Sequence, residues 1–151
     1  MKKFYIMLGV WFISVIVIFI ASGVYSKFPA SDYDKLVVPY LKRIIPEISK
    51  WDPATTRELM VAEVAAAIPE DRFNRGIAMF SKLGKLQSMA EPEFEKVYHD
   101  QGTIVGKQTI VEYNTEAEYT NGDATINVKL LDKDGQFEIY RINFSSKVLA
   151  E

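Results

Sequence analysis

The chain has 151 residues, of which 48% are hydrophobic and 25% charged, and this is enough for one domain with its own core. It contains no cysteine, which excludes thiol catalysis, thiolate metal sites, disulfides and a cysteine-linked lipid anchor. After residue 26 the chain carries 16 basic and 20 acidic residues, and this weakly acidic balance disfavours a nucleic-acid partner, because phosphate binding needs a basic face.

The first predicted element is an apolar segment, Phe4–Tyr25, which has 22 residues without a charge. As a helix it would span ~33 Å, which matches the ~30 Å hydrocarbon core of a bilayer. We therefore expect residues 4–25 to form a transmembrane helix that acts as a signal anchor. A cleaved signal peptide and a buried core helix are the other interpretations. Gly9 and Trp11 are candidates for contact with another membrane helix, although Trp11 could equally face lipid.

The orientation of this segment follows from the charges beside it. Two lysines lie in the tip of the chain, residues 1–3, whereas Lys27 is the only charge close behind the segment. The positive-inside bias therefore places the tip in the cytoplasm. We expect a short linker, residues 26–31, and then one periplasmic or otherwise extracytoplasmic domain, residues 32–151, held close to the inner (plasma) membrane.

Three helices are predicted in the first half of this domain. An apolar stripe with three- and four-residue spacing predicts a first helix of about 18 residues that begins near Asp32 and bends or breaks near Pro46. An Asp-Pro start signal predicts a second helix over residues 52–68. A third helix is expected over residues 69–84, with a glycine as its C′ residue.

After the helices the apolar period changes to two. Residues 85–89 are a candidate short strand, while residues 91–100 are ambiguous and could form a helical turn. Alternating side chains over residues 103–119 predict a long strand. Asn121-Gly122 follows this strand and is typical of a type I′ hairpin turn.

Two further strands complete the predicted sheet. Residues 126–130 alternate again, and Asp134-Gly135 indicates a second hairpin turn before a last strand over residues 136–148. The phase of that strand slips, which predicts a bulge near Tyr140-Arg141. The expected fold is α+β, with about three helices packed on a curved antiparallel sheet of three to four strands.

Two stretches carry a resemblance to a known superfamily. Residues 80–89 (FSKLGKLQSM) lead from a helix end into a strand, and residues 119–144 hold the Asp-Gly turn, an aromatic and the bulged last strand. This pattern resembles the nuclear transport factor 2-like domains, also called cystatin-like α+β cones. The resemblance implies a curved sheet around helices with a cone-shaped cavity. Its candidate lining residues, for which ordinary core is the alternative, are Val111, Tyr113, Tyr119, Ile126, Val128, Phe137 and Ile139.

Candidate chemistry is sparse. His99, beside Asp100, could be a base, but a polar loop position is the alternative. Arg72 and Arg75 could hold an anionic group or simply face solvent. The chain contains no phosphate-binding glycine loop, no HExxH motif and no Gly-x-Ser-x-Gly elbow. Three strand glutamates could bind a cation but also fit a solvated sheet face: Glu112, Glu116 and Glu118.

These observations favour a protein without catalytic, metal or cofactor-binding residues. We expect a single-pass membrane accessory or scaffold protein whose extracytoplasmic cone domain binds other membrane or periplasmic subunits. A module that binds a small apolar ligand in the cone cavity is the main alternative, and a small lyase or isomerase of the same superfamily is a further one.

Overall fold

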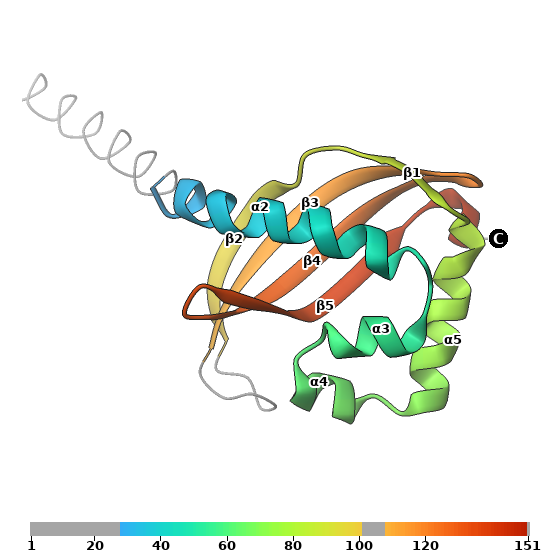
Figure 1. Cartoon of the computed structure of the whole chain (residues 1–151), viewed down its shortest axis with the longest axis horizontal. Coiled ribbons are helices and arrows are strands. Elements are labelled where there is room, and N and C mark those ends of the chain that lie inside the picture. The colour runs from blue at the N-terminus through green and yellow to red at the C-terminus, as the bar shows by residue number, and fades with distance from the viewer. Residues whose placement is uncertain (1–27, 101–107, 151) are drawn as a thin grey trace, which may run out of the picture. The chain divides into compact units, whose positions relative to one another are not determined.

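The computed structural model describes residues 28–100 and 108–150 of the chain. The predicted membrane segment, residues 4–25, lies outside this part, as do the tip and most of the linker. The described chain divides at Lys35: residues 28–35 form the first turns of helix α2, and an α+β unit begins at Leu36. Figure 1 shows this unit as a group of helices followed by a twisted antiparallel sheet.

Helix α2 (Phe28–Ile48) begins four residues before the predicted start and continues through both of its prolines. Pro39 and Pro46 are exposed, so the backbone groups that each ring leaves unpaired can bond with water. The helix is therefore not broken at Pro46, and it ends two residues later, at Ile48; the predicted bend stays a prediction. The chain turns only after the helix, where Trp51 has a φ of 59°.

The predicted second helix is split into α3 (Pro53–Glu58) and α4 (Ala62–Ala67). Between them the chain is extended: the Val61 amide donates to the Ile139 carbonyl at 2.9 Å, and the Ile139 amide donates to the Leu59 carbonyl at 2.9 Å. This pairing with the sheet replaces the helical hydrogen bonds that a continuous helix would have formed. Sequence periodicity could not reveal it, because the partner strand lies some 80 residues away in the sequence.

Helix α5 (Glu70–Phe80) ends in a short 3-10 turn, η1 (Ser81–Leu83), and then Gly84. Gly84 has a φ of 83° and a ψ of −146°, a conformation that glycine adopts readily but that differs from the left-handed helical conformation of a typical C′ residue. The Gly84 carbonyl accepts a hydrogen bond from the Trp51 indole at 2.7 Å, which ties the end of α5 to the turn after α2.

Among the described residues the sheet has five antiparallel strands, one more than the upper limit predicted. Its strands are β1 (Leu86–Met89), β2 (Glu93–Asp100), β3 (Gln108–Tyr119), β4 (Gly122–Lys133) and β5 (Gln136–Ser145). Strands β1 and β2 pair one after the other with the same side of β3, and β4 and β5 follow on the other side. Strand β5 is therefore an end strand, and a short 3-10 turn, η2 (Lys147–Leu149), comes after it.

Strand β2 is the main addition to the predicted sheet. Its charged residues suit a strand that pairs with β3 on one side only, because edge strands tolerate such side chains. The two hairpins also differ. Asp134 and Gly135 both have positive φ, as a type I′ turn requires. In the first hairpin the two loop residues are Thr120 and Asn121, neither with positive φ, so the predicted type I′ turn is wrong there.

The core lies between one face of the sheet and α2 from Leu36 onward, as Figure 1 shows. The Tyr40 ring lies 6.2 Å from the Phe137 ring, and the Ser49 and Tyr119 hydroxyls are 2.8 Å apart. This hydrogen bond opposes the effect of burial, which raises the pKa of Tyr119. The largest completely buried side chains include Leu41, Ile44, Ile45, Tyr113, Ile126 and Leu130.

The opposite sheet face is mostly polar. Glu116 and Glu118 are exposed, as expected for a solvated face, but Glu112 is only 9% exposed. Its carboxylate accepts a hydrogen bond from the Asn127 amide at 2.7 Å and lies 3.7 Å from the Lys96 ammonium. Oε1 is therefore hydrogen-bonded, whereas the buried Oε2 has the Lys96 charge nearby but accepts no hydrogen bond from the described residues.

Candidate functional site

A mostly apolar groove lies between α5 and β5. Its volume is about 430 Å³. Figure 1 shows α3, α4 and α5 together beyond the β5 side of the sheet. The lining residues come from α2, α3, α4 and α5, from the links before and after α4, and from β5: Ile48, Thr56, Met60, Val64, Ile68, Arg72, Phe73, Gly76, Ile77, Phe80, Tyr140, Arg141, Ile142 and Phe144.

The groove meets β5 along its edge rather than at one face. Tyr140, Arg141 and Ile142 follow one another in the strand and all three line the groove. Strand pairing is irregular at Tyr140, so side chains do not alternate strictly here and all three can reach one cavity. Met60, which bridges the outer edge of the strand at Ile139, lines the same cavity, so the groove lies beside that edge. Main-chain groups of β5 are therefore presented toward this space.

Within residues 28–100 and 108–150, another segment pairs with this edge at Ile139 alone. The chain between α3 and α4 forms a parallel bridge, Met60 with Ile139. One residue further, the strand bulges: Ile139 pairs with Leu130 and Arg141 with Lys129, so Tyr140 is the extra residue that the sequence predicted. Past the bulge, no helix or loop within the described residues makes a backbone hydrogen bond with residues 141–145.

Helix α5 forms the opposite wall. Phe73, Ile77 and Phe80 lie at four- and three-residue spacing, so they share the helix face that lines the groove. Gly76 lies on the same wall, and a Cβ placed on it would meet nothing within 4 Å outside its own helix. The missing side chain at this position leaves part of the groove empty.

Aromatic contacts fix α5 at both ends of this gap. The Phe80 and Phe144 rings are 4.9 Å apart, which joins the last turn of α5 to β5. Nearer its start, Phe73 lies under the Arg57 guanidinium at 4.4 Å, and the same guanidinium donates to the Ala65 carbonyl at 2.9 Å. These contacts join α5 to β5 at one end and to α3 at the other, and the groove lies between them.

The charged residues of the lining are all positive. Arg72 on α5 and Arg141 on β5 are exposed, and no Asp, Glu or His is among the described lining residues. An occupant with apolar groups and a negative charge would therefore be complementary to the groove.

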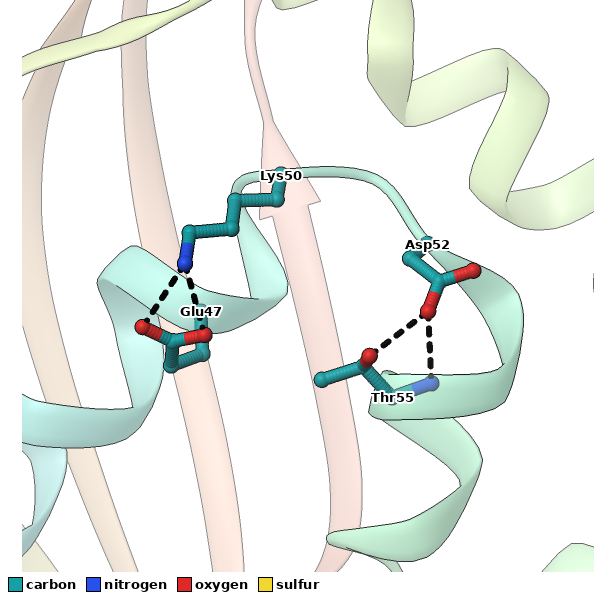
Figure 2. A network of polar contacts seen from close by, with 4 residues as sticks. All are labelled: Glu47, Lys50, Asp52 and Thr55. Carbon is teal, nitrogen blue, oxygen red and sulfur yellow. Dashed lines mark hydrogen bonds and ion pairs between the residues drawn. The ribbon is translucent and has the colours of Figure 1, made fainter.

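A capped turn sets the position of α3, which supplies Thr56 to the groove (Figure 2). The Thr55 hydroxyl and amide donate to the Asp52 carboxylate at 2.6 and 3.1 Å. These hydrogen bonds lower the pKa of Asp52 below its ordinary value. The neighbouring Lys50 ammonium contacts the Glu47 carboxylate at 2.9 Å, an exposed pair at the end of α2.

The seven residues predicted as cavity lining are all buried, and none of them lines this groove. They belong to the sheet face that packs against α2 or to the strand ends beside it: Val111, Tyr113, Tyr119, Ile126, Val128, Phe137 and Ile139. The sequence had indicated two parts of the real groove, the apolar stripe of α5 and the bulge near Tyr140. It could not indicate that they face each other, because the break between α3 and α4 was not expected.

The remaining candidate residues lie elsewhere. His99 is exposed, and its Nδ1 is 3.2 Å from the Thr109 hydroxyl, outside the groove. Arg75 forms an exposed ion pair with Asp71 at 3.1 Å, whereas Arg72 lines the groove. Gly9 and Trp11 fall outside the described residues, where their predicted membrane contact stays a prediction.

Comparisons with protein-family models, with curated proteins and with solved structures found no match. Within residues 28–100 and 108–150, no helix is both long and apolar enough to cross a membrane. Over the same residues, no three His, Asp or Glu side chains are grouped so that they could hold a metal ion. The geometry of the groove therefore carries the functional interpretation.

Proposed function

We propose that this chain is a single-pass, membrane-anchored accessory or scaffold protein that binds a partner protein in the groove between α5 and β5 and catalyses no reaction. The observation that carries the proposal is the groove itself. Its walls are mostly apolar, yet no described side chain fills it, and its charged residues, Arg72 and Arg141, are both cationic. Apolar surface left open in this way is typical of binding sites.

The predicted N-terminal anchor supports a role at a membrane. We infer that residues 4–25 span the inner membrane with the tip in the cytoplasm, and that the α+β unit works on the extracytoplasmic side. The order of the elements, helices followed by a twisted antiparallel sheet, is compatible with the nuclear transport factor 2-like superfamily. We retain membership of that superfamily as part of the proposal.

A small amphiphilic anion is the second candidate occupant. The groove volume of about 430 Å³ lies within the range of small-molecule sites, roughly 300–1,000 Å³. Arg72 or Arg141 could hold an anionic head group while the apolar walls hold its tail. This alternative places the ligand beside β5 and not in the core between α2 and the sheet.

Site-specific photo-crosslinking in intact membranes tests the proposal. A photoreactive phenylalanine analogue replaces Phe80, which lines the groove, and in a matched variant it replaces Met79, which is 42% exposed on the same helix and does not line it. We expect the Phe80 position to capture one defined protein and the Met79 position to capture much less of it. The same pattern should persist in the presence of excess lipid.

Two results would contradict the proposal. Equal capture from both positions would mean that the groove does not select the partner. Capture of lipid or another small molecule alone at Phe80 would favour the amphiphilic anion instead.

A further inference from the structure

We propose that the groove binds an extended, acidic and apolar segment of the partner, which adds as a strand to the outer edge of β5 beyond the bulge at Tyr140. This inference rests on the proposed function, because it names the chemistry of the partner at the same site. It follows from three features of the groove: the open strand edge, the apolar wall opposite it and the sign of the charges at the groove.

The edge of β5 already accepts one neighbour. At Ile139 both main-chain groups bond outward, the amide to the Leu59 carbonyl and the carbonyl to the Val61 amide, each at 2.9 Å. This segment bridges in parallel with the strand and then leaves it to begin α4. The edge from Arg141 to Ser145 continues the same strand, with no backbone bond from a described helix or loop. Main-chain groups on such an edge are a template for an added strand.

The wall opposite the edge suits the side chains of an added strand. Alternate residues of such a strand point to opposite sides. One set would meet Phe73 and Ile77 of α5, which are nearly buried, and the space beside Gly76. Apolar residues are expected at these positions, because burial in this apolar space removes their surface from water.

The other set of side chains would carry the negative charge. Arg141 is exposed on β5 and Arg72 is exposed on α5, and no carboxylate among the described lining residues neutralises them. An opposite charge on the occupant therefore improves complementarity, and a positive charge is disfavoured. Alternating apolar and acidic residues are the sequence pattern that satisfies both requirements.

Peptide binding to the full chain in phosphatidylcholine nanodiscs tests the inference. The probe is a fluorescent octapeptide that alternates valine with glutamate, and its anisotropy reports binding. One comparison peptide alternates valine with lysine. A second keeps the valine–glutamate sequence but carries N-methyl groups on alternate amides, so that one side of its main chain cannot donate hydrogen bonds. Both registers of methylation are tested.

We expect the glutamate peptide to bind at least about tenfold more tightly than the lysine peptide, and one methylated register to lose about tenfold or more. The Arg72→Gln and Arg141→Gln variants should each weaken binding of the glutamate peptide about threefold. Arg75→Gln is the matched control: Arg75 lies on the same helix but outside the groove, and its loss should leave binding unchanged.

Three results would overturn the inference. Equal binding of both methylated registers would show that the groove uses side-chain contacts without strand pairing. Equal binding of the lysine peptide would exclude the predicted charge. The third is no binding of the glutamate peptide up to about 1 mM. If photo-crosslinking at Phe80 still captured a protein, the proposed function would stand and only the inference of an added strand would fail. If dodecanoate bound and no peptide did, the proposed function and the inference would both fail.

Discussion

The inner face of the sheet and its β5 edge are both apolar, but they are packed in opposite ways. Against α2 the side chains fill the space, and Leu41, Ile45 and Tyr113 have no exposed surface. Beside β5 a cavity of about 430 Å³ remains between Ile77 on α5 and Ile142 on the strand. The first region therefore supplies stability, and the second is the site that we propose for binding.

The difference arises from how each helix is attached. Helix α2 has 21 residues, and from Leu36 onward it lies against the sheet face. Helix α5 follows two short helices, and the segment between those helices occupies the edge of β5 at Ile139. An added segment takes up about 4.8 Å beside a strand, so the helices that follow begin farther from the sheet. The pairing that breaks the predicted second helix therefore also creates the groove.

The largest effect is expected from opening a cavity in the filled region. Leu41→Ala should lower the free energy of unfolding by about 2–5 kcal/mol, because Leu41 is completely buried and its neighbours cannot collapse fully. Met79→Ala is the control, with a change of about 0.5 kcal/mol or less. Urea titration of the full chain in mild detergent measures both. Similar losses for the two variants would mean that the inner face is not the stabilising region.

The second-largest loss of stability is expected from a backbone position just after α5. Gly84→Ala places a Cβ against the Thr120 hydroxyl at a positive φ, and we expect a loss of about 2–3 kcal/mol. Adding Thr120→Ala removes the overlap and should recover part of this loss, while the cost of the positive φ remains. The same urea titration measures both variants. If the double variant recovered no stability, the whole loss would come from the backbone conformation at Gly84.

A substitution in the groove should increase the stability of the protein. Gly76→Ala is expected to raise the free energy of unfolding by about 0.5–1 kcal/mol, because alanine favours the helix and its Cβ meets no neighbouring segment. Thermal or urea unfolding measures the gain. A loss of stability would show that the space beside Gly76 is occupied, which would remove the contrast between the two regions.

The smallest effect is a pH dependence at the cap of α3. The Asp52 carboxylate stabilises the helix when ionised, and its folded-state pKa is lowered from the ordinary value of 3.8. Its contribution is therefore complete above that value and disappears as the pH falls through the lower folded-state pKa. Asp52→Ala should melt earlier than the wild type at pH 6, and the difference should shrink below about pH 4. A constant difference would contradict this role.

Much of the fold follows from local patterns in the sequence. The apolar period locates α2 and α5, the Asp-Pro signal marks the start of α3, and the phase slip locates the bulge at Tyr140. These features depend on residues close together in the chain, so the sequence contains their cause. The α+β class is confirmed in the same way, with four α-helices and five strands among the described residues.

The features that were not predicted depend on distant partners. Strand β2 exists because β3 offers it an edge, and the break after α3 exists because Ile139 accepts Leu59 and Val61. The groove combines both kinds of cause. The sequence predicts its two walls, an apolar helix stripe and a bulged strand. The distance between the walls depends instead on the contacts of α5 at Phe73 and Phe80. No local pattern encodes that separation.

Filling the groove without disturbing the core is the most direct test of its role. Gly76→Leu places an apolar side chain in the empty space beside β5, and Gly76→Ala is the matched variant that adds only one methyl group. Both are combined with the photoreactive residue at Phe80 in intact membranes. We predict that Gly76→Leu abolishes capture of the partner while its free energy of unfolding stays at or above that of the wild type, and that Gly76→Ala retains most of the capture. Undiminished capture by a stable Gly76→Leu protein would contradict the assignment of the groove as the binding site.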